Sequence, residues 1–267
     1  MTIQIFAASK LKIERANRHI SDLDQTLNAF RESKPYRIVI EKDSDPEMCR
    51  LVVRTGIELP SEFSAIIGDA VHNLRAALDL LACDLVRQNG GDVEEVYFPF
   101  CANGNDLELM IKKRHIDRAA PQVVDIIRSL KPYTGGNVAL RGIHDLDITD
   151  KHKLLIPIIA INRIQNFAPT MGGFPMFTLQ NVGLLNAVDG RVVAVLPIPE
   201  NYKIGQNFDP IIDIAFGEGQ PFIYEALIPT LHQVSQLVDG IVNIFIKHFE
   251  SLPNLCALRF VKDERLP

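Results

Sequence analysis

Residues 61–88 constrain the fold most, because they have the apolar periodicity of a single long helix. Sequence signals mark both the start and the end of that helix. Ser61 is a favourable N-cap, and Glu62 places a negative charge in the first turn, where it suits the helix dipole. The helix stops at Gly90-Gly91, a common C-terminal signal. The sequence therefore predicts a helix about 40 Å long, at 1.5 Å per residue.

Polar side chains occupy the side of this helix opposite its main apolar stripe. The stripe consists of Ile67, Val71, Leu74, Leu78, Leu81 and Leu85. His72, Arg75 and Asp79 fall on the other side, among small and apolar residues, so that side is not a plain solvated face. Arg75 and Asp79 are four residues apart and can form an ion pair. We predict either an internal polar network or a ligand-binding or catalytic site, because buried polar groups need partners.

A second polar segment lies at 137–156, which the pattern predicts to be a helix with an interruption near Thr149. It contains Asp150, Lys151 and His152. We expect these residues to meet the polar side of the 61–88 helix, because two helices that bury charge usually pair those charges. A shared network would make the stability effects of Asp79→Ala and His152→Ala non-additive.

Two strings carry a resemblance to known proteins. The first is Gly68-Asp69-x-x-His72-Asn73-Leu74-Arg75-x-Ala77-Leu78-Asp79, and the second is Asp150-Lys151-His152-Lys153. Together they resemble the signature of a group of bacterial proteins of unassigned activity. The resemblance implies a shared fold and no particular reaction. A more distant similarity is to the HEPN helical-bundle ribonucleases, which place an Arg and a His on one helix; here His72 precedes Arg75. That similarity implies acid–base chemistry by His72 or His152, with Arg75 and Lys151 stabilising phosphate charge.

The rest of the chain predicts an α+β fold. Apolar residues spaced three and four apart predict long helices over 8–32 and 225–249. Residues 36–54 form two β-branched runs around a turn, which predicts a β-hairpin. Residues 156–225 alternate such runs with Asp-Gly and Gly-Gly turns, which predicts a mostly antiparallel β-rich insertion. Its predicted strands lie at 156–161, 176–179, 191–196 and 211–216. We therefore predict one domain over 1–267: three long helices, shorter helices within 104–155, and this insertion.

Composition limits the class of protein. The 267 residues carry a net charge of −5, which disfavours nucleic acid as a partner without excluding a local basic groove. Four scattered cysteines without a Cys-x-x-Cys motif fit a reduced, cytoplasmic protein. The sequence shows no signal peptide and no apolar run of membrane-spanning length, so no membrane association is expected. No cofactor is predicted, and a homodimer through a helix face is one expectation.

Three functional classes follow. The first is a cytoplasmic helical-bundle protein whose His/Arg/Asp network is structural or binds a small polar ligand. The second is a metal-independent endoribonuclease of the HEPN type. The third is a metal-dependent phosphohydrolase built on His144-Asp145, His152 and His72, since histidine and carboxylate ligands favour metal binding. The candidate site residues are His72, Arg75, Asp79, Asp150, Lys151 and His152.

Overall fold

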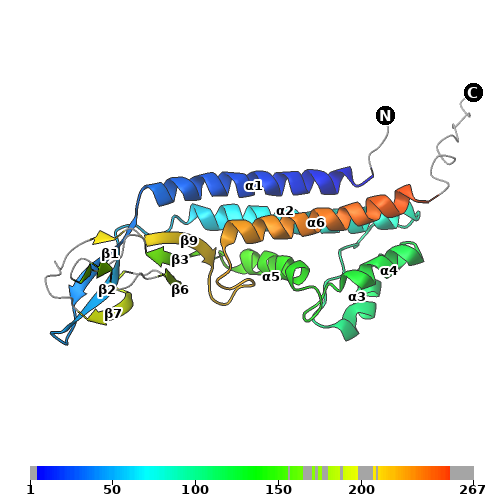
Figure 1. The fold of residues 1–267 in the computed structure, drawn as a ribbon. Helices are drawn as coiled ribbons and strands as arrows, with labels where there is room; N and C mark the ends of the chain where they lie inside the picture. Colours follow the sequence, from blue (N-terminus) through cyan, green and yellow to red (C-terminus); the bar gives the residue numbers. More distant parts are fainter. Residues whose placement is uncertain are drawn as a thin grey trace, which may run out of the picture. The chain divides into compact units, whose positions relative to one another are not determined.

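The structure is a computed structural model. It describes residues 5–155, 157–164, 170–171, 174–175, 180–186, 189–197, 207–208 and 210–252. Within these residues, six α-helices combine with antiparallel sheets, which confirms the predicted α+β fold (Figure 1). The chain divides into two compact units. The first unit comprises Met1–Arg18, Ala70–Asp147 and His232–Pro267, and the second comprises His19–Asp69 and Ile148–Leu231. A single domain over the whole chain stays a prediction.

The three long helices lie where the apolar periodicity predicts them. They are α1 (Ala7–Glu32), α2 (Glu62–Gln88) and α6 (Leu227–Glu250). In the first unit α1 contacts both of the others: Lys10 Nζ donates to Asp239 of α6 at 2.6 Å, and Lys12 Nζ donates to Asn73 of α2 at 3.3 Å. Each helix buries an apolar stripe, so packing between the stripes stabilises the bundle.

Three shorter helices belong wholly or mostly to the first unit: α3 (Leu107–Lys113), α4 (Pro121–Leu130) and α5 (Val138–His152). Pro121 occupies the first turn of α4, where its missing N–H costs nothing. The helix α5 passes through Thr149 without a break, so the predicted interruption there is wrong. Between α2 and α3 the chain is mostly irregular, and Phe98 and Phe100 of this segment are buried. Residues of the candidate site pack on the Phe100 ring and hydrogen-bond to the backbone of Phe98.

The second unit contains the strands. The predicted hairpin is present as β1 (Tyr36–Lys42) paired antiparallel with β2 (Met48–Thr55). Two strands of the 156–225 insertion extend this hairpin into a four-stranded sheet of order β7-β2-β1-β8, with β7 at Val192–Pro197 and β8 at Asn207–Phe208. The hairpin and the insertion therefore share one sheet.

The remaining strands form two smaller antiparallel sheets. One has the order β6-β3-β9, with β3 at Pro157–Ile164, β6 at Gln180–Asn186 and β9 at Pro210–Phe216. The other pairs β4 (Thr170–Met171) with β5 (Phe174–Pro175). Strands β3, β7 and β9 match predicted strands, whereas β6 was not predicted. The strand predicted at 176–179 lies outside the described residues.

Candidate functional site

The first unit holds a polar cluster that α2 and α5 build around the irregular segment 96–101. We call it the α2–α5 cluster. Its members are His72, Arg75, Asp79, Phe98, Phe100, Arg141, His144, Asp145 and Asp147. The three α2 residues are candidates from the sequence, and the structure brings them together with partners from α5.

The ion pair between Arg75 and Asp79, predicted from their spacing, is present. Arg75 Nη1 lies 2.5 Å from Asp79 Oδ1, and its geometry makes the contact an ion pair without a hydrogen bond. Asp79 Oδ1 also accepts the backbone N–H of Phe98 at 2.9 Å. The Arg75 side chain is only 11% exposed, so its charge depends on the Asp79 carboxylate for compensation. Asp79 thereby ties the 96–101 segment to α2.

His144 of α5 contacts the other side of the Arg75 guanidinium. Arg75 Nε donates to His144 Nδ1 at 3.4 Å, and the imidazole stacks on Phe100 with ring centroids 4.7 Å apart. The guanidinium carbon of Arg75 also lies 4.7 Å from the centre of the Phe100 ring. Burial, followed by the positive charges of Arg75 and Arg141, lowers the pKa of His144 to about 4. A neutral ring with its hydrogen on Nε2 leaves Nδ1 able to accept from Arg75.

His72 differs from the other members because it is open to solvent. Its Nδ1 lies 3.0 Å from Oδ1 of Asp147, and the His72 side chain is 57% exposed while that of Asp147 is 3% exposed. An ionised carboxylate only accepts, so Nδ1 carries the hydrogen and Nε2 of a neutral ring keeps its lone pair. The pair is an accessible imidazole held in one tautomer by a buried carboxylate.

Asp147 was not among the residues that we predicted for the site. A signal for it exists in the sequence, because Leu140, Ile143 and Asp147 follow the spacing of one buried helix stripe. A carboxylate at an apolar position of such a stripe requires a partner. Identifying that partner as His72, 75 residues earlier, requires the tertiary structure.

Arg141 and Asp145 form a second ion pair within the α2–α5 cluster. The Arg141 guanidinium contacts both Asp145 oxygens, at 2.6 and 3.1 Å, and its Nη1 donates to the carbonyl of Cys101 at 2.7 Å. Both oxygens of Asp145 are therefore engaged with an arginine. Across the described residues, no three His, Cys, Asp or Glu side chains gather where they could hold a metal ion.

The remaining candidates, Asp150, Lys151 and His152, fall in the second unit. Lys151 and His152 are exposed at the end of α5. Asp150 lies against Gly68 of α2, since a Cβ at Gly68 would be 2.6 Å from the Asp150 carboxyl carbon. The two sequence strings thus meet within the second unit at this glycine, and the absence of a side chain at Gly68 is what admits the carboxylate.

We expect Gly68→Ala to give none of the stabilisation that alanine normally brings to a helix interior. That gain is about 1 kcal/mol, but here the new methyl group would displace the Asp150 carboxylate. Gly240→Ala in α6 is the matched control, because a Cβ there meets no atom within 4 Å. Urea unfolding should show Gly240→Ala more stable than wild type and Gly68→Ala not. In an Asp150→Ala background the gain from Gly68→Ala should return; if it does not, the contact is not the cause.

None of the helices in the described residues combines the length and apolarity that a membrane span requires. Comparison of the chain with protein-family models, with curated proteins and with solved structures gives no match. The function therefore has to be inferred from the side chains themselves.

Proposed function

We propose that the protein binds a small polar ligand through the imidazole of His72, and that the rest of the α2–α5 cluster is structural. The observation that supports this is the exposed His72 ring fixed at Nδ1 by the buried Asp147 carboxylate. Because the Asp147 carboxylate accepts from Nδ1, the lone pair of Nε2 in the neutral ring points to solvent and can accept a hydrogen bond. A ligand that offers a hydroxyl or N–H group would hydrogen-bond to that nitrogen.

The contacts of Arg75 and Asp79 support a structural role for these two residues. The Arg75 guanidinium is largely buried and already meets Asp79, His144 and the Phe100 ring. The Asp79 carboxylate receives a backbone N–H from the neighbouring segment. Groups engaged on several sides fix the packing of a core and offer few remaining donors or acceptors to a ligand.

Ligand binding is testable by thermal unfolding against a panel of polyols, nucleosides and phosphate monoesters. A compound that binds the native protein raises the melting temperature by mass action. We expect at least one class to stabilise wild type and to have no effect on His72→Gln. His19→Gln, which changes a partly exposed histidine of α1, is the control and should respond as wild type does. A shift that survives in His72→Gln would place the ligand elsewhere.

The same His72–Asp147 pair favours a second candidate, the metal-independent endoribonuclease. In RNA cleavage a base removes the proton of the 2′-hydroxyl, and Nε2 of a carboxylate-oriented imidazole is suited to that step. Stabilisation of phosphate charge would then fall to a cationic side chain of the same unit such as Arg75. The net charge of −5 counts against RNA as a substrate, which is why we rank this candidate second.

RNA cleavage by the purified protein decides between the two candidates. For a ribonuclease we expect activity that persists with a chelator and falls by about 100-fold or more in His72→Gln, the usual range for a lost acid–base group. Asp147→Asn should also reduce it, and His19→Gln should not. Each variant must first show the circular dichroism of wild type. No cleavage by folded wild type would remove the ribonuclease and leave ligand binding in place.

A further inference from the structure

The second unit contains a cavity of about 370 Å³ at the open end of the β1–β2 hairpin. Three of its lining residues are basic: Lys34, Arg37 and Arg54. One lining residue, Asp189, is acidic, and it accepts the backbone N–H of Thr55, which also lines the cavity. A concave site with this excess of positive charge and with arginine side chains attracts oxyanions.

The hairpin register places the two arginines side by side. Arg37 of β1 and Arg54 of β2 are directly opposite each other in the antiparallel pair, so their side chains leave the same face of the sheet. Like charges directly opposite each other are unfavourable, so the fold must compensate them or leave them for a ligand.

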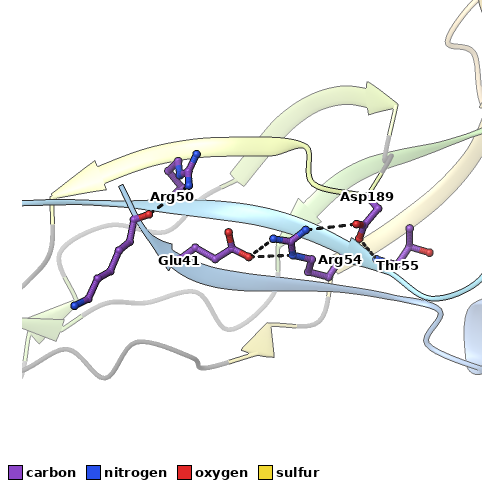
Figure 2. A network of polar contacts seen from close by, with 6 residues as sticks. Glu41, Arg50, Arg54, Thr55 and Asp189 are labelled. Carbon is purple, nitrogen blue, oxygen red and sulfur yellow. Dashed lines mark hydrogen bonds and ion pairs between the residues drawn. The ribbon is translucent and has the colours of Figure 1, made fainter. Parts of the chain in front are cut away.

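Of these two arginines, only Arg54 has carboxylate partners among the described residues that compensate its charge. Arg54 donates Nε and Nη2 to Glu41 Oε1, at 2.9 and 2.5 Å, and its Nη1 lies 3.4 Å from Asp189 Oδ2 (Figure 2). Arg37, in contrast, has no ion pair or hydrogen bond from its guanidinium to any part of the chain that the structure describes. Its five N–H donors face no protein carboxylate there.

The contacts of the Asp189 carboxylate show how an oxyanion can be bound at the edge of this cavity. Its Oδ1 accepts the backbone N–H of Thr55 at 2.9 Å, while its Oδ2 contacts the guanidinium of Arg54 (Figure 2). The next residue, Gly190, has a φ of +78°, which glycine adopts without strain. The turn at Gly190 directs the Asp189 carboxylate toward Arg54 and Thr55. The protein thus already binds one of its own carboxylates at the edge of the cavity, through a charged and a backbone donor.

We propose that the cavity binds a small oxyanion, a phosphate or carboxylate group, between Arg37 and Arg54. The guanidinium of Arg37 supplies the charged hydrogen bonds. Asp189 competes with the ligand for Arg54 and so weakens binding. This site belongs to the second unit and does not depend on the function proposed for His72.

Isothermal titration of the full chain with inorganic phosphate, and separately with malonate, tests the site at low ionic strength. The oxyanion that binds should do so at least about tenfold more weakly in Arg37→Gln, the usual loss for a charged hydrogen bond. Arg15→Gln, which removes the same charge from an exposed position of α1, is the control and should bind as wild type does. Comparing the two titrants shows whether phosphate or carboxylate is preferred.

Asp189→Asn should change anion binding in the opposite direction to Arg37→Gln. Asparagine keeps an oxygen for the Thr55 N–H and removes the competing charge, so we expect the anion to bind several-fold more tightly. A role of Asp189 in folding alone would not produce this gain. The proposal is overturned if neither anion binds wild type or Asp189→Asn, or if Arg37→Gln binds as well as Arg15→Gln.

Discussion

Asp79→Ala should lower the free energy of unfolding by about 3 kcal/mol, the range measured when one partner of a buried ion pair is removed. The substitution leaves the Arg75 guanidinium, 11% exposed, without its carboxylate. It also leaves the backbone N–H of Phe98 without the acceptor that it has at 2.9 Å. Asp79→Asn should cost less, because an amide oxygen can still accept from Phe98.

Asp125→Ala is the matched control for this loss. Asp125 also pairs with an arginine, since Arg128 Nη1 lies 2.6 Å from its carboxylate, but both side chains are exposed and Arg128 keeps a second carboxylate partner in Glu108. Exposed pairs contribute between zero and about 1 kcal/mol, so this variant should unfold close to wild type. Urea denaturation of all three variants at pH 7 gives the comparison. Equal losses for Asp79→Ala and Asp125→Ala would show that the α2–α5 cluster does not depend on this ion pair.

Local patterns in the sequence were enough for the three long helices, although they wrongly predicted an interruption in α5. The bounds of α1, α2 and α6 follow from apolar spacing and from caps such as Ser61, both of which act within a few residues. The Arg75–Asp79 pair is predictable for the same reason, since residues four apart on a helix are neighbours.

Long-range pairing could not be predicted in this way. The strand β6 contains Gly183 and begins and ends with polar residues, so its strand signal is weak. The addition of β7 to the β1–β2 hairpin depends on register between segments about 140 residues apart, which no local pattern specifies. The same limit applies to the site, where Asp147 and His144 reach α2 only through tertiary packing.

The lowered pKa of His144 should make the folded protein less stable in mild acid. Its folded pKa of about 4 lies below the ordinary value of 6.5, so between these values the unfolded chain binds more protons than the native one. The free energy of unfolding should therefore rise with pH across this window and fall as the pH drops from 6.5 to 4. Below pH 4 both states hold the proton and this residue causes no further loss.

The expected loss is about 2 kcal/mol, smaller than the full pKa difference implies, because the ring keeps partial contact with solvent. Protonation would give Nδ1 a hydrogen that faces the Arg75 N–H and would place a third positive charge beside Arg75 and Arg141. The difference in unfolding free energy between wild type and His144→Gln, measured from pH 4 to 8, isolates this residue from the carboxylates that titrate in both proteins. A difference independent of pH would mean that His144 ionises as freely in the fold as in the unfolded chain, and the stacked ring on Phe100 would then have to be open to water.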